Sequence, residues 1–166
     1  MSNQSPNFII NASIIQQSPL GLELSPEQCE KLASVVTARG LEKGMMLLEE
    51  GQQDDSIHII TSGELEVVKL TGGGDWVVLQ VLRPGEMAGE LGFIDGLEHS
   101  AAIRALNNVE VFSLTRPELE KLLDEDPHLV YQVMRAIMRT VHGILRRMNL
   151  QLVEMTNYVT KYHGRY

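Results

Sequence analysis

Short segments of alternating apolar and polar residues follow one another closely between about residues 43 and 114, and this run constrains the fold most. Turns rich in glycine, aspartate or proline separate the segments, most clearly at residues 61–63 and 72–75. Closely spaced short strands are typical of an antiparallel sandwich, barrel or jelly roll. Since no helical pattern interrupts the run, we exclude a doubly wound parallel sheet. We predict a mainly β fold of the α+β class, an antiparallel β jelly roll with flanking helices.

Helix signals precede this β body. Ser25, Pro26 and Gln28 supply an N-cap, a proline at the first helical position and the third residue of a capping box. A helix is therefore predicted from Pro26, with Gly40 placed to end it in the left-handed conformation. Residues 1–24 are polar and irregular, and we expect them to form an N-terminal arm.

A long helix is predicted to follow the β body, because Asp126 and Pro127 form a strong helix start. Over residues 127–160, apolar positions recur in steps of four and three with one stutter, a heptad seam typical of coiled coils. At ~1.5 Å per residue the helix is about 50 Å long, more than the β body can cover, so we expect it to mediate a homodimer. Residues 161–166 form a short tail. The expected interface positions are Val130, Met134, Ile137, Val141, Ile144, Met148, Leu152, Met155 and Val159.

Charge and composition exclude several classes of protein. A net charge of −8 opposes general attraction to nucleic acid or to an anionic membrane surface. No apolar run reaches the ~18 residues of a membrane span, and the first residues lack the pattern of a signal peptide. The single cysteine, Cys29, cannot form an internal disulfide. We expect a cytoplasmic protein with no membrane association.

Three motifs occur in a fixed order along the chain: spaced glycines with an aspartate, two glycine-bracketed turns, and a strand of small residues. They comprise Gly44, Gly51, Asp55 and Gly63, then residues 84–86 and 89–92, then residues 100–105. In this order the sequence resembles the cyclic-nucleotide-binding domain family, most of all the sensor half of bacterial catabolite-activator and Fnr-type regulators. The resemblance implies that residues 25–126 form a β roll of that type with flanking helices.

The resemblance also implies a binding site for a cyclic nucleotide such as cyclic AMP, with no cofactor. Glu90 would accept a hydrogen bond from the ribose 2′-hydroxyl, and a helical turn at residues 89–91 would direct free backbone amides toward the phosphate. Small side chains after the turn would let further amides approach. The implied phosphate cassette is Gly89, Glu90, Leu91, His99, Ser100 and Ala101.

Two positions depart from the family pattern. His99 stands where the family has an arginine that binds the phosphate, and imidazole cannot form the same two-pronged contact. Losing one hydrogen bond to a charged group costs roughly 1.5–3 kcal/mol, about one to two orders of magnitude in affinity. Counting from Pro127, Ile144 and Leu145 fall where the catabolite-activator type has two hydroxyl residues that contact the base. Arg104 matches another family arginine and offers no obvious replacement.

These observations predict a non-enzymatic, dimeric sensor module that signals to an unidentified protein partner through an atypical pocket. The alternative is a dimeric scaffold that retains the fold and has lost the ligand. Catalysis and haem binding are weaker alternatives, because the histidines show no metal-ligand spacing and no axial ligand stands out. Only a few residues follow the long helix, so we expect no direct DNA binding. The basic residues of that helix are expected to form a solvated face: Arg135, Arg139, Arg146 and Arg147.

Overall fold

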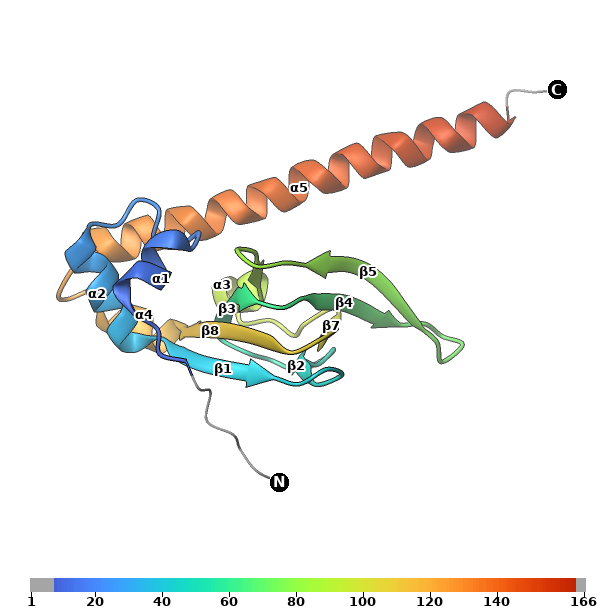
Figure 1. The fold of residues 1–166 in the computed structure, drawn as a ribbon. Helices are drawn as coiled ribbons and strands as arrows, with labels where there is room; N and C mark the ends of the chain where they lie inside the picture. The colour runs from blue at the N-terminus through green and yellow to red at the C-terminus, as the bar shows by residue number, and fades with distance from the viewer. Residues whose placement is uncertain (1–7, 164–166) are drawn as a thin grey trace.

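The computed structural model describes residues 8–163, which form two antiparallel four-stranded sheets flanked by helices (Figure 1). The first sheet has the order β1-β8-β3-β6 and the second has the order β2-β7-β4-β5. The predicted α+β fold with an antiparallel β roll is confirmed. The strands are β1 (Thr37–Leu41), β2 (Met46–Leu48), β3 (Ser56–Ser62), β4 (Leu65–Leu70), β5 (Trp76–Leu82), β6 (Met87–Ala88), β7 (Ala102–Ala105) and β8 (Val109–Thr115).

Alternation along the strands divides the core into two clusters. Strand side chains point to opposite faces in turn, so Ile57 and Ile59 of β3 face the helices while Ile60 faces the interior of the roll. On β8, Phe112 belongs to the helix side and Val111 to the interior. Both faces of the first sheet are therefore buried: the helices cover its outer face, and its inner face lines the interior of the roll.

Five helices accompany the sheets within residues 8–163. They are α1 (Ala12–Gln17), α2 (Pro26–Val35), α3 (Glu90–Asp95), α4 (Arg116–Lys121) and α5 (Pro127–His163). The capping box predicted for α2 is present, since Ser25 Oγ accepts from the Gln28 N–H and Gln28 Oε1 accepts from the Ser25 N–H. The structure contains no helix both long and apolar enough to cross a membrane, among the residues it describes.

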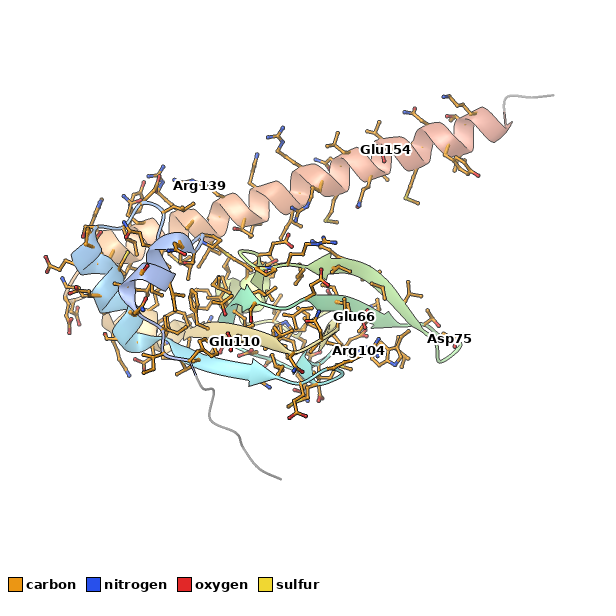
Figure 2. All side chains as sticks on the ribbon, viewed as in Figure 1. Glu66, Asp75, Arg104, Glu110, Arg139 and Glu154 are labelled. Atoms are coloured by element: carbon orange, nitrogen blue, oxygen red, sulfur yellow. The ribbon has the colours of Figure 1, made fainter. Side chains whose placement is uncertain are left out.

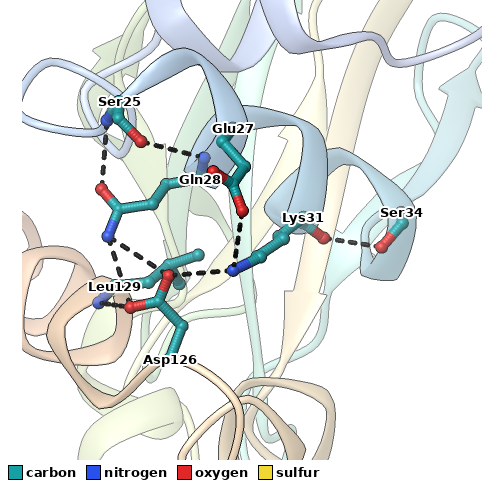
Figure 3. A network of polar contacts seen from close by, with 7 residues as sticks. All are labelled: Ser25, Glu27, Gln28, Lys31, Ser34, Asp126 and Leu129. Carbon is teal, nitrogen blue, oxygen red and sulfur yellow. Dashed lines mark hydrogen bonds and ion pairs between the residues drawn. The ribbon is translucent and has the colours of Figure 1, made fainter.

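A polar cluster fixes the start of α5 to α2 (Figure 3). The Asp126 carboxylate accepts a hydrogen bond from the Leu129 N–H at 3.0 Å, so it caps α5 as predicted. The same carboxylate pairs with Lys31 Nζ at 3.3 Å and accepts from Gln28. Because one group serves both helices, the origin and direction of α5 are set by the body of the chain.

Two sequence predictions at the N-terminal side are wrong. Residues 12–17 form α1, and its Ile15 is fully buried, so this part of the expected irregular arm is helical and belongs to the core. Gly40 does not end α2. That helix ends at Val35, because the β-branched residues that follow lead into strand β1, where Gly40 pairs with Glu110. Residues 1–7 and 164–166, parts of the expected arm and tail, lie outside the described residues.

The long helix begins as predicted and continues to His163. Its first half packs on the helix side of the core, where Val130 is almost fully buried and Ile137 completely so. These two residues were expected at a dimer interface, and that assignment is corrected: they contact the body of their own chain. Arg135 and Arg139 both form ion pairs with Glu23, so they are not simply solvated. Arg139 is labelled on α5 in Figure 2.

Candidate functional site

The predicted cassette lies where β6 turns into α3. Gly89 forms the N-cap of α3 with φ of 81°, a left-handed conformation that favours glycine. A side chain there would have its Cβ 2.8 Å from the carbonyl oxygen of Ser56, so the close packing also requires glycine. Glu90 and Leu91 follow as the first helical residues, and α3 lies against α5. The short helix interrupts the β run, which the periodicity did not predict and the family resemblance did.

Glu90 is half-buried beneath the long helix. Burial raises the pKa of its carboxyl above the usual value, while the Arg147 guanidinium opposes this shift electrostatically. Arg147 therefore lies close enough to the cassette to act on Glu90. Arg147 is exposed, as expected for a solvated helix face, and its electrostatic effect on Glu90 is an addition that the heptad pattern does not predict.

His99 lies beside α3. Its ring packs against Gly92, where an added Cβ would lie 2.8 Å from His99 Cε1. Its Nε2 atom is buried without a hydrogen-bond partner, and the ring lines a hollow of about 290 Å³ together with Arg39, Gln52 and Asp54. The backbone of His99 is fixed by hydrogen bonds in both directions, to Gln52 and from Gly51.

The residues after His99 lie at the surface. Ser100 is exposed and Ala101 is half-buried. Lys69 Nζ donates to the carbonyl oxygen of Ser100 at 2.6 Å and also pairs with Glu50 at 2.8 Å. This lysine holds the segment in place, and the sequence analysis did not identify it.

The other predicted contacts are divided between α5 and β7. Ile144 is half-buried and Leu145 is exposed on α5. Arg104 on β7 binds Glu66 on β4 through Nε at 2.7 Å (both are labelled in Figure 2). Its guanidinium also lies over the ring of Trp76. Because its guanidinium is already paired with a buried carboxylate, Arg104 could bind another anion only by giving up that pair.

A buried polar network lies behind the cassette and was also missed. His58 of β3 is 3% exposed, and its ring nitrogens contact Ser113 Oγ at 2.7 Å and Asp54 Oδ2 at 3.1 Å. Burial alone would raise the pKa of Asp54, but hydrogen bonds from His58 and Ser56 outweigh it and bring the pKa to about 2.

The same three residue types form catalytic triads elsewhere, but this geometry does not suit a nucleophile. Ser113 is buried in the middle of the first sheet, paired with Thr37 on one side and His58 on the other. A substrate carbonyl could not approach its hydroxyl without opening that sheet. Within residues 8–163, no three histidine, cysteine or acidic side chains gather as metal ligands.

Comparison with known proteins places this geometry in a family. The model of the cyclic nucleotide-binding domain matches residues 38–126, which include the spaced glycines, β6, α3 and His99. The chain belongs to the cyclic nucleotide-binding domain family. The family that the ordered motifs predicted is therefore confirmed, and it is a family of regulatory domains.

Three relatives illustrate the range of the match. An uncharacterized NTE family protein of Mycobacterium tuberculosis is 30% identical over 125 residues, which are 75% of this chain and 21% of that protein. The cyclic AMP receptor protein of Thermus thermophilus is 27% identical over 81% of this chain and 61% of that protein. A crystal structure of the N-terminal domain of a transcriptional regulator from Streptomyces coelicolor matches with a TM-score of 0.70 and 26% identity, covering 81% of this chain and 94% of that one. The chain thus spans less than two thirds of the two full-length relatives.

Proposed function

We propose that this chain is a regulatory module that binds a cyclic nucleotide at the α3 cassette, dimerises through α5 and signals to a protein partner. One observation supports it above the others: Glu90, the residue that the family uses for the ribose hydroxyl, opens α3 directly under the long helix. A ligand at this point would contact the β body and α5 together. Its binding energy would then bias their arrangement, which is the requirement for a signal.

The missing arginine makes the pocket atypical. His99 packs on Gly92, and its Nε2 has no hydrogen-bond partner within residues 8–163. A neutral imidazole carries no charge, so the phosphate would rely on backbone amides and on Arg147 for positive charge. Because Arg147 belongs to α5, its distance from the cassette changes whenever α5 moves relative to the α3 turn. We therefore expect weak affinity and a strong dependence of binding on the position of α5.

Dimerisation is the proposed role of the outer part of α5. The exposed apolar side chains Met148, Leu152 and Met155 continue the heptad seam beyond the region covered by the body. A second copy of the same helix is the simplest partner, because a two-fold axis gives both helices the same contacts. In a cytoplasmic module of this kind, the signal would reach the partner through a change in body–helix arrangement.

Calorimetric titration with cyclic AMP and cyclic GMP at pH 5.5 and 8 tests the proposal, with His99→Arg measured in parallel. We expect saturable but weak binding by the wild type and binding at least ~10-fold tighter by His99→Arg, the affinity equivalent of one charge-assisted hydrogen bond. Leu123→Arg, at an exposed position outside the cassette and the heptad seam, is a matched control for added charge. Absence of binding in both wild type and His99→Arg would refute the nucleotide proposal.

The second candidate is a dimeric scaffold without a ligand. The observation in its favour is His99, whose ring fills space against Gly92 and faces a hollow that Glu90 does not line. Under this alternative, the oligomeric state and partner binding would be unchanged by nucleotide, and His99→Arg would not restore affinity.

A further inference from the structure

The buried network behind the cassette has a defined hydrogen-bonding pattern. An ionised Asp54 carboxylate can only accept, so His58 Nε2 must carry the proton that it shares with Asp54. When the imidazole is neutral, Nδ1 then accepts from the Ser113 hydroxyl, whose oxygen lies 2.7 Å away. Asp54 also accepts from the Ser56 N–H at 3.0 Å. Both nitrogens of the His58 ring are therefore fixed, and the ring cannot rotate without losing a buried hydrogen bond.

This network touches the cassette turn at two points. A Cβ added at Gly89 would lie 3.4 Å from His58 Cδ2, so the His58 ring packs directly on the left-handed N-cap of α3. At Gly92, one turn later, a built Cβ would lie 3.0 Å from the carbonyl oxygen of Asp54. The strand pairing adds a third link, because His58 is opposite Ala88 in the β3–β6 ladder. The first turn of α3 is thus supported from behind by the residues that form the network.

An apolar side chain at position 58 would fill the same space without the cost of burying polar groups. It would not fix an orientation, because apolar contacts are not directional, whereas hydrogen bonds weaken steeply when their angle changes. The network joins β3, β8 and the loop before β3, and the α3 turn rests on it. Its distinctive contribution is therefore orientation rather than burial.

We propose that the Asp54–His58–Ser113 network is a positioning device for the cassette, which holds the turn from Gly89 to Gly92 in the geometry that binds the cyclic nucleotide. His58 and Asp54 act in this proposal as positioning residues, through their contacts with the turn. The consequence for affinity rests on the proposed function, whereas the effect on the turn itself does not.

The test compares three variants of the full chain. His58→Phe keeps a ring of similar size and removes both hydrogen bonds, and His58→Gln keeps a donor within reach of Asp54. Ile59→Val is the matched control, since it trims a buried neighbour on β3 whose side chain faces the helix side of the sheet. Amide hydrogen exchange is followed by NMR at Phe93, whose N–H donates to the Gly89 carbonyl at 3.0 Å, with the Cys29 amide in α2 as the remote reference.

We expect exchange at Phe93 to accelerate at least ~10-fold relative to Cys29 in His58→Phe, to return to within ~3-fold in His58→Gln, and to stay unchanged in Ile59→Val. Cyclic AMP affinity should fall at least ~10-fold in His58→Phe and be largely restored in His58→Gln. If His58→Phe does not fold, Ser113→Ala removes only the hydrogen bond to His58 Nδ1 and should show a smaller acceleration at Phe93.

An unchanged Phe93/Cys29 exchange ratio in His58→Phe, or in Ser113→Ala if it replaces that variant, would overturn the inference. Equal acceleration in Ile59→Val would do the same, because general destabilisation would then explain the effect. If Phe93 responds as expected but the wild type and His99→Arg bind neither nucleotide, the positioning role stands and the proposed ligand is refuted.

Discussion

The two halves of α5 share one heptad pattern and have opposite environments. In the inner half, residues 127–144, the apolar side chains of Val130, Val133 and Ile137 are buried against the chain's own helices and first sheet. In the outer half, residues 145–161, every side chain is exposed, and the helix projects away from the β body, with Glu154 near its middle (Figures 1 and 2).

The difference shows that a heptad seam identifies an apolar helix face and does not identify what covers it. A partner helix and the chain's own body both require apolar residues at a spacing of three and four. Isolated helices of this length are only marginally stable in water, so the outer half gains from a partner, whereas the inner half already has one. The predictions below test this division, beginning with the largest effect.

The largest effect is expected from a matched pair of substitutions at seam positions, Ile137→Ala and Leu152→Ala. Ile137 is completely buried, so its truncation should cost about 2–5 kcal/mol in the free energy of unfolding. Leu152 is 64% exposed, so in dilute monomer its truncation should cost less than about 0.5 kcal/mol. Urea denaturation measures both. Sedimentation equilibrium should show weaker self-association for Leu152→Ala. If the two variants lose the same free energy of unfolding and the same self-association, the division of α5 is contradicted.

Removal of the cap that anchors the inner half should have the next largest effect. Asp126→Ala should cost about 1–2 kcal/mol, because it removes the acceptor for the Leu129 N–H and the contacts with Lys31 and Gln28. These contacts, first that from Leu129, lower the pKa of Asp126. Its contribution is therefore present above the unfolded-state pKa of about 3.9 and is lost as pH falls through the lower folded value. Thermal unfolding from pH 7 to 2 measures this, and Asp124→Ala provides an exposed control on the same turn.

A smaller effect of opposite sign is expected near the boundary of the two halves. Gly143 lies within α5, and an added Cβ would contact nothing within 4 Å. Gly143→Ala should therefore stabilise the helix by about 0.5–1 kcal/mol. Circular dichroism during thermal unfolding would register it. A loss of stability would indicate that a partner helix approaches closely at Gly143, which would move the start of the interface inward.

The smallest effect concerns the cassette. Arg147 opposes the burial that raises the pKa of Glu90, so Arg147→Met should raise that pKa further. Carbon-detected NMR titration of the Glu90 carboxyl measures the change, with Arg146→Met as the control on the neighbouring position. An identical pKa in both variants would show that α5 does not approach the cassette through Arg147.

Local signals in the sequence predicted the elements well. The capping box at Ser25 and the Asp126 cap each depend on residues within one turn, and the structure contains both. The 72–75 turn forms the predicted hairpin between β4 and β5, with Gly74 in the left-handed conformation. The two errors on the N-terminal side, at α1 and Gly40, arose where tertiary packing outweighed local preference: Ile15 is buried in the core, and the chain after Val35 pairs with β8.

The candidate site was only partly predictable. The cassette position was predicted from the ordered motifs, because positions that require a positive φ are occupied by glycine and can be recognised in the sequence. The network around His58 could not be recognised in the same way, because Asp54 lies four residues before His58 but Ser113 lies 55 residues after it. Its role depends on strand register, which sets Ser113 opposite His58.

The sequence by itself determined the strand and helix periodicities and their caps and turns. These properties depend on neighbouring residues or on one residue type. Only the tertiary structure decided that Val130 and Ile137 belong to the core, that the charge of Arg147 acts on Glu90, and that a buried histidine packs on the α3 turn. Those facts depend on contacts between segments distant along the chain, and a single sequence without a fold does not specify which apolar face or charged side chain will meet which partner.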